Sequence, residues 1–224
     1  HTSKGHFVVS FIVNGDKLIL REEISDPLLV SPNDLVMINE DQFYITNDHG
    51  STSNNKKMIE DYLQLSKANV LYYDGNQFSV SASKLSYANG IALDKDKAYL
   101  FVAETIAKRI SLYKRNVSNE LIYVKSIYLN TGVDNIELDQ NGNLWIGSHP
   151  KMLNFIQHAK NSNNNSPSQV IKISSNQYEE YISEEIYLDD GNMISGSSSA
   201  AVYKNIMLIG AVFEDHFLHC NFEN

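Results

Sequence analysis

A hairpin unit that returns three times along the chain constrains the fold more than any other feature of this sequence. It is first seen in residues 31–50, where an Asn-Asp pair opens a short apolar run and a polar turn follows. A second apolar run then ends in Thr-Asn-Asp-His. Two such runs on either side of a turn predict a β-hairpin, with oxygen-bearing side chains gathered at one end.

The later copies keep this layout. Residues 89–104 and 134–149 each open on Asn or Asp, whereas residues 197–213 keep the hairpin but open on serines. Copies that follow one another at roughly 40 to 50 residues, with one hairpin-rich unit per period, are typical of β-propeller blades. The sequence therefore predicts an all-β propeller.

The opening residues of the first three copies are Asn33, Asn89 and the pair Asp134-Asn135. A single Asn in such a place is more typical of a turn. In a propeller, however, the inner strands all start on one face around the central axis, so we expect these side chains to converge. Such oxygens suit Ca²⁺, which takes about 6 to 8 of them, whereas zinc calls for His and Cys. Water or residues outside this chain would complete the shell.

Composition narrows the range of functions. A chain of 224 residues with 42% hydrophobic content can bury a substantial core, and we expect one domain over residues 1–224. The formal charge of −9 argues against a nucleic-acid partner. No apolar run approaches the roughly 20 residues of a membrane span. No Gly-x-Ser-x-Gly motif supports a serine esterase.

Further elements fit the same architecture. Residues 6–24 form apolar runs around an Asn-Gly turn, which predicts another hairpin. Residues 56–66 carry apolar side chains at nearly helical spacing, and we expect a helix packed on the end of the propeller. Asn116 and Asn164 open glycosylation sequons in expected loops. Cys220 is the only cysteine, which indicates a free thiol or a partner outside this chain.

Six stretches, in order, carry a resemblance to a known family: SPNDLV, FYITNDHG, YANGIALD, TGVDNIELD, LWIGSHP and AAVYKNIMLIGAVF. They are similar to the serum paraoxonase/arylesterase family from His1 to about Cys220. The resemblance implies a six-bladed propeller with two calcium ions in its central tunnel, of which this chain, cut inside a blade, would supply four to five blades. It also implies hydrolysis of lactones and aryl esters, of organophosphate triesters in some members, and a secreted or secretory-pathway protein.

The resemblance also suggests individual roles. Asn33, Asn89, Asp134 and Asn135 match ligands of the catalytic calcium, and Asp34 matches a ligand of the structural one. His1 matches one of a pair of histidines proposed to activate water, and Cys220 matches a cysteine bonded to one near the amino terminus, here outside the chain. The matches to the wall of the substrate pocket are Tyr87, Val212 and Phe213. Tyr87 stands where the family usually has Phe, so we expect a slightly more polar pocket.

These observations lead to a mechanistic hypothesis and two alternatives. Calcium would polarise the ester or lactone carbonyl while His1 or Asp48 deprotonates the attacking water. One alternative is a calcium-stabilised propeller that binds a ligand or partner without catalysis. The other is a more distant propeller lactonase of the gluconolactonase or strictosidine-synthase type, which the sequons and ordered motifs disfavour. The family also associates the helix at 56–66 with lipid contact, so a lipid or lipoprotein surface is a candidate partner.

Overall fold

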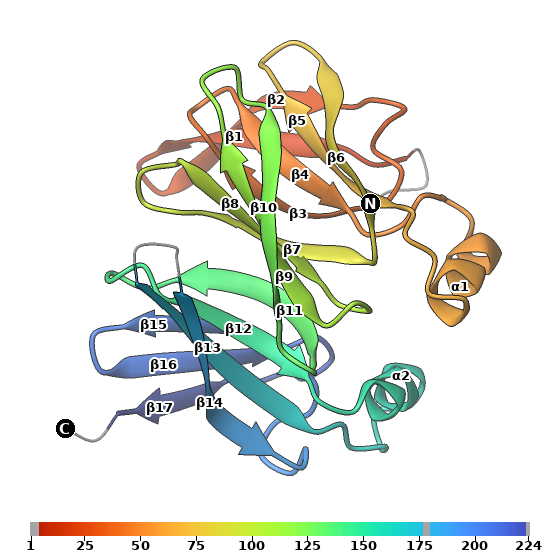
Figure 1. The fold of residues 1–224 in the computed structure, drawn as a ribbon, viewed down its shortest axis with the longest axis vertical. Helices are drawn as coiled ribbons and strands as arrows, with labels where there is room; N and C mark the ends of the chain where they lie inside the picture. The colour runs from red at the N-terminus through yellow and green to blue at the C-terminus, as the bar shows by residue number, and fades with distance from the viewer. Residues whose placement is uncertain (1–4, 177–179, 223–224) are drawn as a thin grey trace.

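The computed structural model describes residues 5–176 and 180–222, which form five antiparallel sheets and two helices (Figure 1). The strands are β1 (Val8–Asn14), β2 (Lys17–Ile24), β3 (Pro32–Met37), β4 (Phe43–Asn47), β5 (Ala68–Tyr73), β6 (Phe78–Leu85), β7 (Ala88–Leu93), β8 (Tyr99–Glu104), β9 (Arg109–Arg115), β10 (Leu121–Tyr128), β11 (Gly132–Leu138), β12 (Leu144–His149), β13 (Ser168–Asn176), β14 (Glu180–Asp189), β15 (Ser197–Tyr203), β16 (Ile206–Ala211) and β17 (Leu218–Asn221).

Each sheet is a meander of strands that follow one another in the sequence. Three sheets have four strands, β3–β6, β7–β10 and β11–β14, while β15–β17 form a three-stranded sheet and β1–β2 a two-stranded one. The first strand of each larger sheet contacts the first strand of the next, so β3, β7, β11 and β15 lie side by side. This arrangement confirms the predicted all-β propeller, and all four copies of the repeated hairpin form as predicted.

The hydrophobic core lies between neighbouring blades. Every residue of β4 and β12 is buried. Neighbouring blades cover β12 on both faces, whereas β4 is covered by the next blade on one face and by Leu29 and the base of the β1–β2 hairpin on the other. One cluster joins β3–β6 to β7–β9, a second joins β7–β9 to β11–β13, and a third joins β12–β13 to β15–β16. Burial of apolar side chains between blades therefore fixes the distance between the starts of their inner strands.

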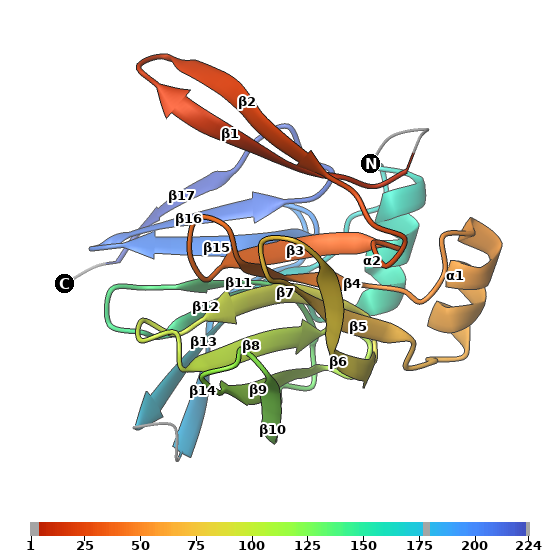
Figure 2. The same cartoon turned by 90° about the horizontal axis from the view of Figure 1, so that it is seen from above.

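The hairpin β1–β2 projects from the rest of the molecule (Figure 2). The strands pair from Val8–Ile24 to Asn14–Lys17 around the predicted Asn-Gly turn. Only Val8 and Ile24, at the base of the hairpin, pack against the cluster formed by β4, β5 and β6. Most of the other side chains of the hairpin are exposed.

Both helices follow the second strand of a blade and lie on the same side of the strands (Figures 1 and 2). Helix α1 (Asn54–Tyr62) confirms the predicted helix, but it has no buried residue, so the expected apolar packing on the propeller is not observed. Polar contacts hold it instead, since Glu60 accepts a hydrogen bond from the Gly50 amide at 2.9 Å. No helix in the described part of the chain is long and apolar enough to cross a bilayer.

Helix α2 (Met152–Lys160) was not expected from the sequence. Its apolar residues Met152, Phe155 and Ile156 stand at helical spacing, and this signal could have predicted it. The helix packs beside the end of β12, since Phe155 stacks on the ring of His149 at 3.7 Å between centroids.

Candidate functional site

The innermost strand of each larger sheet is bulged at the same place. Register with the second strand shifts between Pro32 and Leu35 in β3, between Ala88 and Ile91 in β7, and between Val133 and Ile136 in β11. In β15 it shifts between Ser197 and Ser199. A bulge releases residues from the ladder and re-aims their side chains. The residues released are Asn33-Asp34, Asn89-Gly90, Asp134-Asn135 and Ser198, and they include all five predicted metal ligands.

Neighbouring bulges touch one another. The Ile91 amide donates to Asp34 Oδ2 at 3.0 Å, which joins β7 to β3. A Cβ on Gly90 would lie 2.6 Å from the Asp134 carbonyl oxygen, which requires glycine where β7 approaches β11. Asn135 Nδ2 donates to the Ser198 carbonyl oxygen at 3.1 Å, which joins β11 to β15. The structure thus brings the predicted metal ligands of three blades to one end of the inner strands.

Buried hydroxyl groups fix these strand starts further. Thr46 Oγ1 donates to the Asn89 carbonyl oxygen at 2.8 Å, and Thr105 Oγ1 donates to the Val133 carbonyl oxygen at 2.7 Å. Thr46 lies on β4 and Thr105 directly follows β8, so each bond joins the second strand of one blade to the inner strand of the next. The backbone beside each bulge is therefore held in place by its neighbouring blade.

The three asparagine side chains share one hydrogen-bonding pattern, in which the amide nitrogen donates to a protein acceptor. Asn33 Nδ2 donates to Asp48 at 3.1 Å, Asn89 Nδ2 to Thr105 at 3.4 Å, and Asn135 Nδ2 to Ser198. Among the described residues no group donates to any of the three Oδ1 atoms. Asp134 uses Oδ2 for a hydrogen bond from His149 Nε2 at 3.0 Å. Three amide oxygens and one carboxylate oxygen are consequently available to a cation.

Two further carboxylates interact near these bulges. Burial raises the pKa of Asp34 although the Ile91 and Leu35 amides donate to it, and the charge of Asp134 adds to the rise. Burial likewise raises the pKa of Glu137, with Asp34 contributing. A cation between such groups would relieve their repulsion. Sequence reasoning missed Glu137, whose signal was its place on the same strand, two residues after Asn135.

A histidine flanked by two carboxylates stands at the end of β4. His49 is 6% exposed; its Nδ1 donates to Asp48 at 2.6 Å and its Nε2 donates to Asp61, on α1, at 3.0 Å. Burial alone would lower the pKa of His49, but the two carboxylates raise it to about 9. At neutral pH the ring is therefore an imidazolium. Sequence reasoning did not single out His49, although its position beside Asp48 was a signal.

Asp48 is the residue proposed as a base from the sequence. Burial raises the pKa of this carboxyl, but hydrogen bonds from His49, Ser31 and Asn33 outweigh burial and hold it below its usual range. Asp48 thus stays ionised, and its Oδ2 accepts a hydrogen bond from the side-chain amide of Asn33. The other residue suggested as a base, His1, lies outside the described residues.

The residues suggested for the pocket wall fall into two groups. The Tyr87 ring meets His49 edge-on at 4.9 Å between centroids, and burial raises the pKa of its hydroxyl. Phe213 is half exposed and lies 6.0 Å from Phe155, the ring that stacks on His149. Val212 is exposed beside it.

His149 is buried and hydrogen bonded to Asp134, which favours a positioning role over substrate contact.

The remaining predicted residues lie away from the bulges. Asn116 caps the turn between β9 and β10, where its Oδ1 accepts from the Ser118 amide at 2.9 Å. Asn164 is exposed in the loop between α2 and β13. Cys220, on β17, is a half-buried free thiol.

Comparison with known proteins relates this geometry to a family. A family model described as Arylesterase matches residues 7–222 of the 224-residue chain. The chain belongs to the arylesterase family. Human serum paraoxonase/arylesterase 1 is 35% identical over 197 residues, which make up 88% of this chain and 55% of that protein. The chain therefore spans about half the length of this arylesterase relative.

Solved structures support the fold of this arylesterase-family chain at low sequence identity. The periplasmic gluconolactonase of Pseudomonas aeruginosa aligns with a TM-score of 0.57 and 11% identity over 91% of this chain and 56% of that one. The calcium-binding protein regucalcin of Agrobacterium tumefaciens aligns with a TM-score of 0.54 and 12% identity over 90% of this chain and 61% of that one. At such identities the likeness concerns the fold alone.

Proposed function

We propose that the protein hydrolyses aryl esters and lactones with a Ca²⁺ ion held by Asn33, Asn89, Asp134 and Asn135. The observation that carries this proposal is the shared hydrogen-bonding pattern of the three asparagines, whose amide nitrogens donate to protein acceptors and leave the amide oxygens available. Membership of the arylesterase family supports ester hydrolysis in general. The resemblance of the sequence motifs to this family implies lactones as substrates and calcium as the ion.

The donor set fits calcium better than other common metals. It consists of hard oxygens from three amides and one carboxylate, without a thiolate or a free imidazole nitrogen. Because the four side chains carry only one negative charge, a bound divalent ion stays partly uncompensated. Calcium in this place would act as a Lewis acid toward the carbonyl oxygen of the substrate. We assign Asp34 to a second, structural calcium, with Glu137 as a further carboxylate close to it.

The residues around this ion would handle the proton of the attacking water. Asp48 is ionised at neutral pH and lies against Asn33, so it is our proposed proton acceptor. His49 keeps Asp48 in place and ionised by donating to it. His149 orients the Asp134 carboxylate through its own hydrogen bond.

The surroundings of the site extend the proposal to partners and processing. The exposed side chains of α1, Met58, Ile59 and Tyr62, face solvent beside the strand ends. This exposure fits contact with a lipid or lipoprotein surface. We also propose a secreted protein, glycosylated at Asn116 and Asn164, with Cys220 bonded to a cysteine outside this chain. Residues 1–224 would belong to one propeller domain.

Hydrolysis of phenyl acetate and of a δ-lactone by the full-length protein tests the proposal. We expect EGTA to abolish both activities and added Ca²⁺ to restore them. Asp134→Ala should lower kcat/KM by at least about a hundredfold because it removes a metal ligand. The matched control Asn116→Gln should leave both activities unchanged. Activity that survives EGTA, or equal effects of the two substitutions, would contradict the calcium mechanism.

A further inference from the structure

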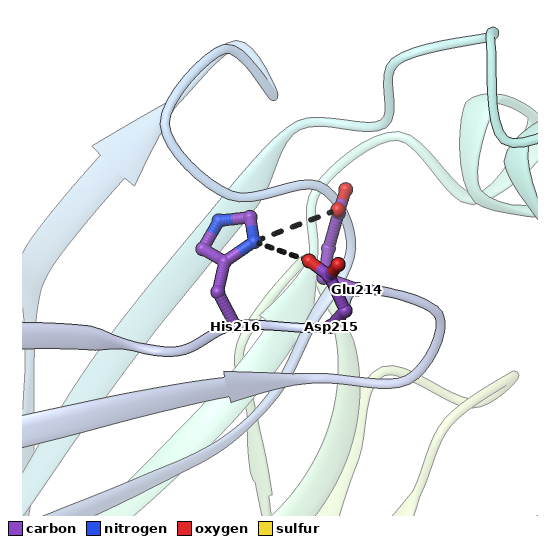
Figure 3. Close-up of side chains that lie close together, drawn as sticks. All are labelled: Glu214, Asp215 and His216. Carbon is purple, nitrogen blue, oxygen red and sulfur yellow. Dashed lines mark hydrogen bonds and ion pairs between the residues drawn. The ribbon is translucent and has the colours of Figure 1, made fainter.

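A second cluster of candidate metal ligands lies in the loop between β16 and β17, which follows Ala211, the partner of Ser197 at the β15 bulge. Glu214, Asp215 and His216 each present one ligand atom, and these atoms all lie within 4.8 Å of one another (Figure 3). His216 Nδ1 lies 3.3 Å from Asp215 Oδ1 and 3.9 Å from Glu214 Oε2. Acidic side chains on a loop do not by themselves make a site, so the surrounding groups decide its chemistry.

The hydrogen bond at the far side of the His216 ring fixes which nitrogen faces the carboxylates. His216 Nε2 lies 3.2 Å from the Met193 carbonyl oxygen. Because a carbonyl oxygen can only accept, Nε2 carries the proton in this bond. Nδ1, which hydrogen bonds to Asp215 Oδ1 at 3.3 Å, is then the nitrogen that faces the carboxylates, and a cation would take the place of the proton in this bond.

A buried histidine on α2 points at the same cluster. His158 is 2% exposed, and its Nδ1 donates to the Asn164 carbonyl oxygen at 2.9 Å. Its Nε2 makes no hydrogen bond within the described part of the chain and lies 3.9 Å from Glu214 Oε1. That separation is too long for a hydrogen bond. A buried ring nitrogen without a partner is costly, so this lone pair beside a carboxylate points to an absent ligand.

We propose that His158 Nε2, Glu214 and His216 Nδ1 bind a Zn²⁺ ion, with Asp215 or water as the fourth ligand. Two imidazoles and a carboxylate suit zinc, whereas calcium prefers an all-oxygen shell. Glu214 links the two rings, with Oε1 3.9 Å from His158 Nε2 and Oε2 3.9 Å from His216 Nδ1. Ligands of a tetrahedral zinc lie roughly 3.3 Å apart, so a bound ion would draw both rings toward this carboxylate. Both histidines already donate their other ring nitrogen to a backbone carbonyl, as metal-bound histidines do.

Such an ion would tie together three segments that are distant in the sequence. His158 comes from α2 and Glu214 and His216 from the β16–β17 loop, while the carbonyl of Met193 joins the β14–β15 loop. His158 also meets the Phe213 ring at 5.7 Å, and Phe213 lies beside the Phe155 ring that covers His149. Zinc would therefore hold α2 and Phe213 in place at the edge of the calcium site without taking part in it.

A calorimetric titration with ZnCl₂ tests this proposal. The full-length protein is first stripped of metal and then resaturated with Ca²⁺. We expect tight binding of one Zn²⁺ and a higher melting temperature. Glu214→Gln and His216→Ala alter side chains that are not buried, so both variants should fold, and each should weaken zinc binding at least about tenfold. His219→Ala, an exposed histidine on β17, is the matched control and should bind zinc as the wild type does.

Cobalt provides a second measurement that does not depend on substituting the buried His158. Co²⁺ at the proposed site should give the intense visible absorption of a four-coordinate ion, and His216→Ala should abolish it. Zinc binding that is unchanged in Glu214→Gln and His216→Ala, or the weak spectrum of six-coordinate cobalt in the wild type, would overturn the proposal.

Discussion

At the scale of single residues, His49 owes its charge to two carboxylates, and this makes stability depend on pH. Its pKa is raised from 6.5 to about 9 in the folded protein. The stabilisation is therefore fully present below pH 6.5, decreases as the pH rises, and is lost above about 9. We expect the free energy of unfolding to fall by roughly 1 to 3 kcal/mol over this pH window. The lower figure allows for solvent screening of the interaction between His49 and Asp61.

Chemical denaturation between pH 6 and 10, with calcium saturating throughout, measures this effect. His49→Gln should flatten the pH dependence, because glutamine carries no titrating proton. His219→Gln, which changes an exposed histidine, should keep the wild-type slope. An unchanged slope in His49→Gln would show that another group titrates.

Tyr87 tests the predicted polarity of the pocket wall. Its hydroxyl stays neutral at physiological pH because burial raises its pKa, and its ring already contacts His49. We expect Tyr87→Phe to shift the ratio of kcat/KM for lactones to kcat/KM for aryl esters toward the aryl esters. Because phenylalanine keeps the aromatic ring, the stability of the variant should be nearly unchanged. An identical ratio in both proteins would mean that the hydroxyl does not meet the substrate.

At the scale of secondary-structure elements, the close approach of β7 to β11 depends on Gly90. A Cβ there would lie 2.6 Å from the Asp134 carbonyl oxygen and 2.7 Å from Asn135 Cα, and backbone cannot rotate aside. We expect Gly90→Ala to destabilise the fold by about 1 to 3 kcal/mol or more and to weaken calcium binding. Gly210→Ala is the control, since its Cβ would meet only the Ser199 hydroxyl, at 2.8 Å.

Urea unfolding and calcium titration of the two glycine variants test this account. A Gly90→Ala protein as stable as Gly210→Ala, with wild-type calcium affinity, would mean that the two strand starts can separate without consequence.

Some of the strands and helices could be predicted from sequence patterns, and others could not. The four repeated hairpins were predictable because alternation of apolar residues and polar turns is a local signal. Helix α2 was missed because its nine residues carry only a short apolar pattern. The lack of packing under α1 was missed because apolar spacing does not reveal whether a surface lies opposite the helix. The bulges were also invisible, since they depend on pairing between strands.

At the scale of the whole molecule, repetition made much of the candidate site predictable. Asn33, Asn89 and Asp134 occupy the same position of three successive blades, so a propeller axis predicts that they approach one another. The contributions of His49, Glu137 and His158 could not be predicted in this way. Their roles depend on contacts between segments far apart in the sequence, such as His49 with Asp61 and His158 with Glu214.

A crystal structure of the full-length protein grown with calcium tests the central claim most directly. We predict a cation at the inner-strand ends, about 2.3 to 2.6 Å from the side-chain oxygens of Asn33, Asn89, Asp134 and Asn135. Side chains that point to separate places, or oxygens too far apart to share one ion, would contradict the account.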